Sequence, residues 1–321
     1  MSKNLELIRQ IGILPLVVLQ DAEDALPLAG ALAEGGIPIA EVTFRTDAAE
    51  AAIARIAEGR PDLLVGAGTV HTVDQAKRAV AAGGRFIVTP GFNPEVVSWC
   101  CENGIDVLPG VVSPADIEQA MGFGLSVCKF FPAAAYGGVK TLKALAGPYA
   151  GISFLPTGGV NEENMLDYLS LPNVAGVGGS FTCPDKLVRA KDWAGIAALC
   201  RSLIQRVLGF SLAHVGINTA DADEAASVAG RLGFLFGQPV EDLPGALFAG
   251  SLAEVVKGPY LGTHGHIGIN TRDIDRAAAY FERIGVPLDW DTAARDDAGR
   301  LKAIYFKEEV GGFALHLRRF S

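Results

Sequence analysis

Short apolar runs alternate with alanine-rich amphipathic stretches eight times between residue 11 and about residue 206. A buried parallel strand reads as a short continuous apolar run, and an amphipathic helix repeats its apolar residues about every 3.6 positions. Eight such units predict an α/β fold in which a parallel sheet closes into a (β/α)8 TIM barrel. The alternative is an open doubly wound sheet, but no G-x-G-x-x-G opens a helix after a strand. The predicted strands are 13–19, 37–44, 63–66, 86–89, 105–108, 125–131, 152–156 and 174–178.

The carboxyl-terminal third contains an internal repeat. Residues 213–219 (AHVGINT) match residues 265–271 (GHIGINT), and the segments that follow each copy are again alike. Each copy predicts the order βαβββ or close to it, with a hairpin turn at residues 296–299 in the second copy. We therefore expect two domains: a barrel over residues 1–208, and a small α+β domain of two paired βαβββ-like modules over residues 209–321.

Composition and charge exclude several classes of protein. Half of the 321 residues are hydrophobic, and the net charge is -9 with no block of Lys or Arg, so nucleic acid is not an expected partner. No apolar stretch is long enough to span a bilayer, and the N-terminus lacks the apolar region of a signal peptide. The five cysteines are odd in number and show no C-x-x-C spacing, which predicts reduced thiols in a cytoplasmic protein.

Lys129 is a charged residue in an otherwise apolar predicted strand, within the run SVCKFFPA. Lysine is rarely fully buried, and burial disfavours its charged form. The neutral amine attacks carbonyl carbons to form a Schiff base, so this residue indicates covalent carbonyl chemistry. The alternative is a lysine at a strand end whose amine reaches water.

Polar residues and glycines follow many of the predicted strands. Glu41 and Arg45 belong to the end of the second strand, and Thr69 follows the third. In a barrel all these strand ends meet at one face, where active sites are built. We therefore expect a carboxylate, a guanidinium and a hydroxyl to lie near Lys129. A carboxylate that only pairs with Arg45 is the other interpretation of Glu41.

Seven glycine-rich or polar motifs occur in order along the predicted barrel: EVTFRT (41–46), GAGTV (66–70), TPG (89–91), KFFPA (129–133), GGVK (137–140), PTGG (156–159) and GGS (178–180). Together they resemble the class I 2-keto-3-deoxy-6-phosphogluconate (KDPG) and 4-hydroxy-2-oxoglutarate (KHG) aldolases over residues 5 to 206. The resemblance implies a Schiff-base lyase that cleaves KDPG to pyruvate and glyceraldehyde 3-phosphate, and KHG to pyruvate and glyoxylate. It also implies that the aldolase chemistry requires no cofactor, that the protein is a homotrimer and that its small-molecule substrate is a phosphorylated 2-oxo sugar acid.

The resemblance implies a role for each matching residue. Lys129 would form the Schiff base with the keto group, and Glu41 would transfer protons during bond cleavage and enamine protonation. Arg45 and Thr69 would bind the pyruvyl carboxylate. The other substrate-binding residues would wall the site or form a phosphate site of backbone N–H groups: Pro90, Phe131, Thr157, Gly158, Gly159, Gly179 and Ser180.

Other functions are compatible with a barrel. A phosphosugar isomerase or epimerase would use a similar phosphate site without a covalent lysine, because a fold does not fix its chemistry. A non-catalytic metabolite-sensing protein and a metal-dependent pyruvate aldolase are the remaining alternatives.

The repeat resembles the glyoxalase/vicinal-oxygen-chelate superfamily over residues 212 to 320, whose members hold a metal with residues on the first and last strands of each module. The matching candidates are His214 and Glu254 in one copy, and His266 and His316 in the other. Three histidines and a carboxylate suit a divalent ion such as Zn²⁺, Fe²⁺ or Ni²⁺. The alternative is a dimerisation or ligand-sensing module without a metal.

Overall fold

A computed structural model describes residues 2–320 and divides the chain into two compact units, Met1–Val207 and Leu208–Ser321. The first is an α/β unit and the second is rich in β-structure. None of the helices within residues 2–320 combines the length and the apolar character that crossing a bilayer requires.

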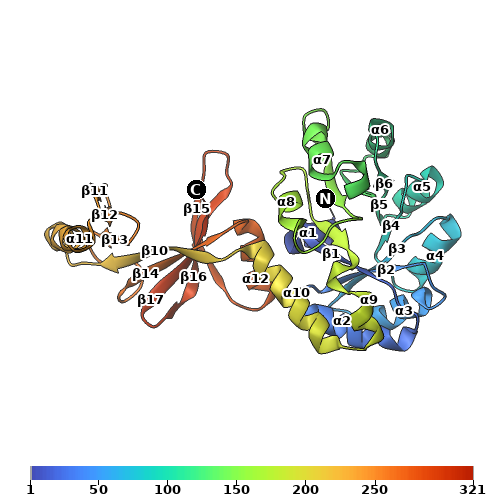
Figure 1. The fold of residues 1–321 in the computed structure, drawn as a ribbon, viewed down its shortest axis with the longest axis horizontal. Coiled ribbons are helices and arrows are strands. Elements are labelled where there is room, and N and C mark those ends of the chain that lie inside the picture. Colours follow the sequence, from blue (N-terminus) through green and yellow to red (C-terminus); the bar gives the residue numbers. More distant parts are fainter. Residues whose placement is uncertain (1, 321) are drawn as a thin grey trace. The chain divides into compact units, whose positions relative to one another are not determined.

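The first unit is built around a curled set of parallel strands (Figure 1). One sheet has the order β5-β4-β3-β2-β1-β9, and a second sheet has the order β6-β7-β8. Only Pro109 separates β5 from β6, and a bridge between Thr157 and Gly178 joins the segment after β8 to β9. The strands are β1 (Ile13–Val17), β2 (Ile39–Thr43), β3 (Leu64–Gly68), β4 (Phe86–Val88), β5 (Asp106–Leu108), β6 (Gly110–Val111), β7 (Val127–Phe130), β8 (Ser153–Pro156) and β9 (Val177–Gly179).

Proline explains the break between β5 and β6. The predicted strand 105–108 continues beyond its expected end, but Pro109 has no N–H to donate to a neighbouring strand. Its carbonyl oxygen still accepts a hydrogen bond of 2.9 Å from the backbone N–H of Lys129. The fifth strand is therefore divided in two at a proline that remains bonded to β7.

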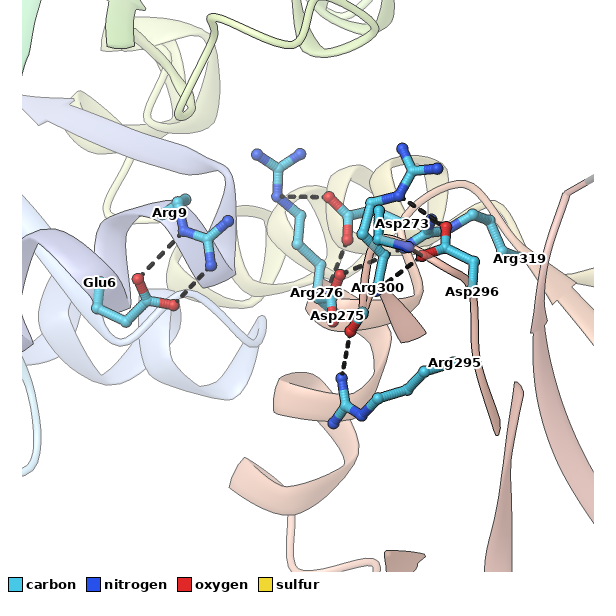
Figure 2. Close-up of polar contacts among 11 residues, drawn as sticks. Glu6, Arg9, Asp273, Asp275, Arg276, Arg295, Asp296, Arg300 and Arg319 are labelled. Carbon is cyan, nitrogen blue, oxygen red and sulfur yellow. Dashed lines mark hydrogen bonds and ion pairs between the residues drawn. The ribbon is translucent and has the colours of Figure 1, made fainter. Parts of the chain in front are cut away.

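Helices lie around the outside of these strands (Figure 1). Their starts follow from the sequence, because Ser2, Thr72, Asn93 and Ser113 each accept a hydrogen bond from a backbone N–H of the first turn. The helices are α1 (Lys3–Ile11), α2 (Ala25–Glu34), α3 (Ala49–Gly59), α4 (Val73–Ala81), α5 (Pro94–Glu102), α6 (Pro114–Gly122), α7 (Gly138–Ala146), α8 (Met165–Leu169), α9 (Asp185–Arg189) and α10 (Trp193–Leu208), with 3-10 turns η1 (Ala22–Asp24), η2 (Ala134–Tyr136) and η3 (Ser180–Thr182). On α1, Glu6 pairs with Arg9 at 3.0 Å (Figure 2).

The second unit has the element order strand, helix and three strands twice. All its strands form one sheet of order β11-β12-β13-β10-β14-β17-β16-β15. Helix α11 packs on β12 and β13, and α12 packs on the last three strands (Figure 1). The elements are β10 (Ser211–Asn218), α11 (Ala222–Phe236), β11 (Val240–Asp242), β12 (Ala246–Ala249), β13 (Ala253–Val256), β14 (Gly265–Thr271), α12 (Ile274–Arg283), β15 (Leu288–Arg295), β16 (Leu301–Val310) and β17 (Phe313–Arg319).

The two repeats meet at the centre of this sheet. Strands β10 and β14, the first strand of each repeat, pair antiparallel, with Val215 opposite Ile267. The last strand of each repeat lies outside its own first strand and parallel to it: β13 beside β10, and β17 beside β14. The pairing gives the centre of the sheet an approximate twofold relation.

The predicted hairpin turn at 296–299 lies between β15 and β16. The backbone N–H of Gly299 donates to the carbonyl oxygen of Asp296 at 2.8 Å. The Asp296 carboxylate accepts from Arg300 at 2.7 Å and lies 3.7 Å from Arg319 on β17 (Figure 2). One acidic residue therefore ties the turn to the neighbouring strand.

Candidate active site and metal centre

Lys129 and Glu41 form a buried ion pair in the first unit. Lys129 lies on β7, where it pairs in register with Gly110 and Leu155, and its side chain is 2% exposed. Glu41 lies on β2 and its side chain is 0% exposed. The amine Nζ donates to Glu41 Oε1 at 3.4 Å. Since β2 and β7 belong to different sheets, this contact crosses the interior that the curled strands enclose.

Two buried oxygen atoms next to this pair have no hydrogen-bond partner among the described residues. They are Oε2 of Glu41 and Oγ1 of Thr43. Residues two apart on a strand face the same side, so both atoms belong to the same interior. Buried polar atoms are almost always hydrogen-bonded in native proteins, and the two oxygens are therefore positioned for a water or a substrate group. The sequence analysis placed Thr43 in a motif but gave it no role; its i, i+2 spacing from Glu41 was the available signal.

Gly68 provides the space that the Glu41 carboxylate occupies. It ends β3, next to β2, where Thr43 is its register partner. A Cβ atom at Gly68 would lie 2.1 Å from Glu41 Oε1 and 2.6 Å from Glu41 Cγ. Any side chain here would displace the carboxylate. Sequence reasoning placed this glycine in a motif but did not assign it a role.

Arg45 and Thr69 contact one another at the ends of the same two strands. The Arg45 guanidinium is exposed, and its Nε donates to Thr69 Oγ1 at 3.2 Å. Thr69 has a φ of 57°, in the left-handed region that non-glycine residues seldom adopt. The hydroxyl of Thr69 therefore orients the arginine, while Glu41 pairs with Lys129 instead of Arg45.

Phe131 and Pro90 lie close to the reactive pair. The centre of the Phe131 ring is 5.1 Å from Lys129 Nζ. The Pro90 carbonyl approaches Gly110 so closely that a Cβ atom there would lie 2.2 Å from its oxygen. Gly110 is the register partner of Lys129. Because Gly110 has no side chain, the loop after β4 can pack directly against the strand beside Lys129.

The loop after β8 packs on the end of β7. Backbone N–H groups of Ala133 and Ala134 donate to the carbonyls of Thr157 and Gly158 at 2.8 and 3.0 Å. Gly158 and Gly159 have φ values of 88° and 81°, which favour glycine. Thr157 is buried, β9 ends with a buried Gly179, and an exposed Ser180 follows it.

This geometry suits carbonyl chemistry. A buried amine can attack a carbonyl carbon once it has given a proton to the adjacent carboxylate. The same carboxylate can then move protons between substrate atoms, because its Oε2 has no hydrogen-bond partner within residues 2–320. The arrangement provides a nucleophile (Lys129), a proton acceptor (Glu41) and a cationic group (Arg45) toward the carboxyl ends of the strands.

A second cluster of reactive residues lies at the centre of the sheet in the other unit. His214 Nε2 is 3.1 Å from His266 Nε2 and 3.2 Å from His316 Nε2. Glu254 Oε2 is 3.3 Å from His214 Nε2 and 3.5 Å from His266 Nε2. The residues come from β10, β14, β17 and β13. The three histidines of the sequence analysis converge, with ligand atoms within 4.8 Å of one another, and Glu254 reaches two of them.

The spacing of these donor atoms fits a metal ion. Four ligands about 2.0–2.1 Å from a tetrahedral ion lie about 3.3–3.4 Å from one another. Hydrogen bonding alone does not explain the cluster. His214 Nε2 lies within hydrogen-bond distance of two other ring nitrogens, but it has either one proton to donate or one lone pair to accept with. Nδ1 of His266 and of His316 is buried without a hydrogen-bond partner in the described chain.

Two glycines create the space for this cluster. In the β10–β14 pairing, Gly216 lies opposite His266 and Gly268 lies opposite His214. A Cβ atom at Gly216 would lie 2.1–2.4 Å from ring atoms of His266. A Cβ atom at Gly268 would lie 2.7 Å from His214 Cε1 and 2.8 Å from His316 Nε2. The repeated H-x-G sequence was the signal for both glycines, but only the antiparallel register reveals their function.

Burial controls the protonation of the cluster. It lowers the pKa of His316 to about 4, with a further contribution from the neighbouring histidines. Burial also lowers the pKa of His214, against the opposing effect of Glu254. The hydrogen bond with His266 holds the pKa of Glu254 below its ordinary value. The two histidines are therefore neutral at pH 7 in the metal-free protein, which is the form that binds metals.

The cluster borders a cavity of about 660 Å³. Arg318 reaches into the same region, with Nη1 3.5 Å from His214 Nδ1. The ring of Tyr305 stacks on His316 with a centroid distance of 4.7 Å, and Tyr260 also lines the cavity. The metal candidates are thus open to a space of ligand size.

Comparison with known proteins links the first unit to one family. A family model described as "Aldolase: KDPG and KHG aldolase" matches residues 5–199. A 2-dehydro-3-deoxy-phosphogluconate aldolase of Treponema pallidum is 46% identical over 202 residues, which cover 63% of this chain and 96% of the relative. A KHG/KDPG aldolase of Escherichia coli K12 is 39% identical over 193 residues, covering 60% of this chain and 91% of the relative.

Solved structures agree with these matches. A KDPG aldolase of Legionella pneumophila, crystallised with pyruvate captured as a covalent carbinolamine intermediate, has a TM-score of 0.61 and 41% identity. The match covers 63% of this chain and 98% of that structure. A KDPG aldolase of Zymomonas mobilis with 3-phosphoglycerate has a TM-score of 0.60 and 35% identity, over 63% of this chain and 96% of that structure. The part of the chain that the family model matches contains both Glu41 and Lys129.

Proposed function

The chain belongs to the KDPG and KHG aldolase family, and on that premise we propose that it cleaves KDPG to pyruvate and glyceraldehyde 3-phosphate through a Schiff base on Lys129. The enzyme is a class I aldolase, a lyase in which a protein amine rather than a metal activates the substrate. KHG, which yields pyruvate and glyoxylate, is a second substrate of the same chemistry, since a similar relative is named for both activities.

The first stage joins Lys129 to the substrate. The neutral Nζ attacks the keto carbon and forms a carbinolamine, and loss of water from it gives the protonated Schiff base. Glu41, 3.4 Å away, accepts the proton that the amine must lose and returns one to the departing hydroxyl. Arg45 binds the carboxylate next to the keto group, where a guanidinium offers paired donors.

The second stage breaks the carbon–carbon bond between C3 and C4. Glu41 takes the proton from the C4 hydroxyl, glyceraldehyde 3-phosphate leaves, and the bonding electrons pass through the Schiff base to form an enamine. Glu41 then supplies a proton to C3, and hydrolysis releases pyruvate and Lys129. Backbone N–H groups of the loops at 157–159 and 179–180 are placed to hold the phosphate.

The buried 3.4 Å contact between Lys129 Nζ and Glu41 Oε1 carries this proposal. Borohydride reduction in the presence of pyruvate should fix a pyruvyl adduct on the peptide that contains Lys129. The Lys129→Ala variant should form none and lose KDPG cleavage, whereas Lys143→Ala, on the exposed face of α7, should behave as wild type. Turnover that survives Lys129→Ala would support a phosphosugar isomerase or epimerase instead.

We also propose that the strands of the first unit close into a (β/α)8 TIM barrel. Counting β5 and β6 as one strand leaves eight positions, joined by parallel pairings from β1 through β5 and from β6 through β8. Strand β9 pairs with β1 and is bridged to the segment after β8, which supports closure.

Oligomeric state and location remain predictions that the family resemblance and the cysteines support. We expect a homotrimer, to be measured by light scattering of the purified protein. A cytoplasmic location agrees with five cysteines that form no disulfide in residues 2–320.

A second function belongs to the other unit: we propose that this glyoxalase/vicinal-oxygen-chelate-like domain holds a divalent metal with His214, Glu254, His266 and His316. Two sets of short distances carry the proposal: His214 Nε2 lies 3.1 and 3.2 Å from Nε2 of the other two histidines, and Glu254 Oε2 lies 3.3 and 3.5 Å from Nε2 of His214 and His266. A metal held there would act as a Lewis acid on an oxygen of a bound molecule.

Elemental analysis of protein purified without a histidine tag tests this second proposal. We expect about one metal ion per chain, lost in His214→Ala and retained in His264→Ala, whose imidazole is exposed in the same unit. A protein that binds no stoichiometric Zn²⁺, Fe²⁺ or Ni²⁺ even after incubation with each ion would leave the dimerisation or sensing module as the better interpretation.

A further inference from the structure

The cavity beside the histidine cluster is lined by two kinds of residue. Phe248, Val256 and Leu243 contribute apolar surface, and Phe248 is the register partner of Glu254. Arg318, Tyr260 and Tyr305 contribute hydrogen-bond donors. Glu254 is the one acidic residue among the described residues that line the cavity, and its carboxylate belongs to the cluster itself. The cavity therefore offers both donating groups and apolar surface to a bound molecule.

Arg318 occupies an unexpected place for a cationic residue. It lies two residues after His316 on β17, so both side chains are on the same face of the sheet. Its Nη1 is 3.5 Å from Nδ1 of His214, in the same ring whose Nε2 faces the other histidines. A guanidinium beside a divalent cation weakens metal binding, because like charges repel strongly where water is partly excluded.

An anion that lies between the metal ion and the Arg318 guanidinium would offset this repulsion. We propose that the cavity binds an organic acid whose carboxylate lies between the metal and Arg318, with its carbon body against Phe248 and Val256. The proposal rests on the metal site proposed above, and it assigns the ligand class of that site. A guanidinium has five N–H donors, so Arg318 can bind a carboxylate while it keeps its contact near His214.

The apolar residues of the cavity favour binding of an organic acid over an inorganic anion. Phosphate would satisfy the charges but would leave the surface of Phe248, Val256 and Leu243 in contact with water. A carboxylate on a ring or a short hydrocarbon body buries that surface, which contributes about 25 cal/mol per Å² of apolar area removed from water. We therefore expect an aromatic or aliphatic acid to bind more tightly than phosphate.

The test uses the full chain loaded with Co²⁺, whose visible absorption reports a change of ligand at the metal. The Lys129→Ala background excludes Schiff-base formation in the other unit. Benzoate should change the Co²⁺ spectrum with saturation, its neutral isostere benzamide should not, and inorganic phosphate should bind more weakly than benzoate. Arg318→Gln should weaken benzoate at least tenfold, and Arg318→Lys should restore part of the loss. Lys307→Gln, exposed on β16, should leave benzoate binding unchanged.

Each result separates the two proposals. Protein that takes up Co²⁺ but shows no benzoate response, equal responses to benzoate and benzamide, or tighter binding of phosphate overturns the organic-acid assignment and leaves the metal site intact. Loss of Co²⁺ itself from Arg318→Gln would make Arg318 a structural residue and would also overturn it. A wild-type chain that takes up no Co²⁺ refutes the metal site, and the ligand assignment with it.

Discussion

At the scale of single residues, the proposed aldolase site contains a buried lysine and a buried glutamate that face each other. Burying either charge alone costs several kcal/mol, so each is tolerated because the other is present. The sequence revealed Lys129 and Glu41 through their unusual positions at apolar strands. It did not reveal the roles of Thr43 and Gly68, because these depend on the register between β2 and β3 and on the direction of the Glu41 side chain, which brings its carboxylate against Gly68.

Removing the charge of Glu41 tests its role in proton transfer. In Glu41→Gln we expect kcat to fall by roughly 10²–10⁴-fold, the usual contribution of a general acid–base group. Steady-state rates with KDPG measure the effect, and Glu58→Gln, exposed on α3, is the control. A Glu41→Gln rate within threefold of wild type would assign proton transfer to another group.

Adding one methyl group at Gly68 tests the geometry of the pair. The Cβ atom of Gly68→Ala would lie 2.1 Å from Glu41 Oε1, so the carboxylate must move away from Lys129. We expect kcat to fall at least tenfold while circular dichroism remains unchanged. Gly122→Ala, where nothing lies within 4 Å of the added atom, should keep full activity. Equal rates for the two variants would show that the carboxylate position is not critical.

At the scale of elements, the histidine cluster is a product of strand pairing. The sequence repeat predicted His214 and His266 as equivalent residues. Glu254 and His316 were harder to match, because the segment from His266 to His316 is ten residues longer than the segment from His214 to Glu254. The structure places that difference in the second repeat, where β15 to β17 have 8, 10 and 7 residues against 3, 4 and 4 in β11 to β13. The register between β10 and β14 could not be predicted from the sequence, because the repeat does not indicate which residues of the two strands lie opposite one another.

Gly216 tests the contribution of the β10–β14 pairing. In Gly216→Ala the new atom would lie 2.1 Å from the ring of His266, so the imidazole must leave the cluster. We expect the metal content to fall severalfold, as measured by elemental analysis. Gly230→Ala on α11 adds the same group where nothing lies within 4 Å, and it should bind metal normally. Retained metal in Gly216→Ala would argue against His266 as a ligand.

At the scale of the whole molecule, the aldolase and the histidine cluster belong to separate compact units. Most of the first unit was accessible from the sequence, because local alternation of strands and helices is enough to indicate a parallel α/β fold. The split of the fifth strand at Pro109 could not be predicted from the sequence. It depends on the pairing of β5 with β4 and of β6 with β7. In the second unit the repeat indicated the element order, whereas the cavity beside Arg318 required the complete sheet.

Removing the second unit tests whether catalysis depends on it. The Treponema pallidum relative aligns over 96% of its length with only 63% of this chain. A chain that ends at residue 208 should therefore fold and cleave KDPG with a kcat within threefold of the full chain. Steady-state kinetics on both proteins measures this. A truncated chain that is folded but inactive would show that the second unit takes part in the reaction.

The stability of the metal-free protein should depend on pH through the histidine cluster. Burial lowers the pKa of His214 and of His316 in the folded state, the latter to about 4, so the unfolded chain binds more protons below pH 6.5. Folded-state stability is then constant above this pH and decreases as the pH falls towards 4. Calorimetry in chelator at pH 7.5 and pH 5.5 should show a larger drop in Tm for wild type than for a His214→Asn/His316→Asn variant. Equal drops would exclude these histidines as the source.

The twofold relation between β10 and β14 bears on how the second unit arose. Each repeat supplies two of the four candidate donors, His214 with Glu254 and His266 with His316, so one repeat alone cannot surround an ion. Two identical chains brought together by a twofold axis would offer every donor in duplicate. A repeat within one chain has no such requirement, and here the two last strands contribute different groups, a carboxylate and an imidazole.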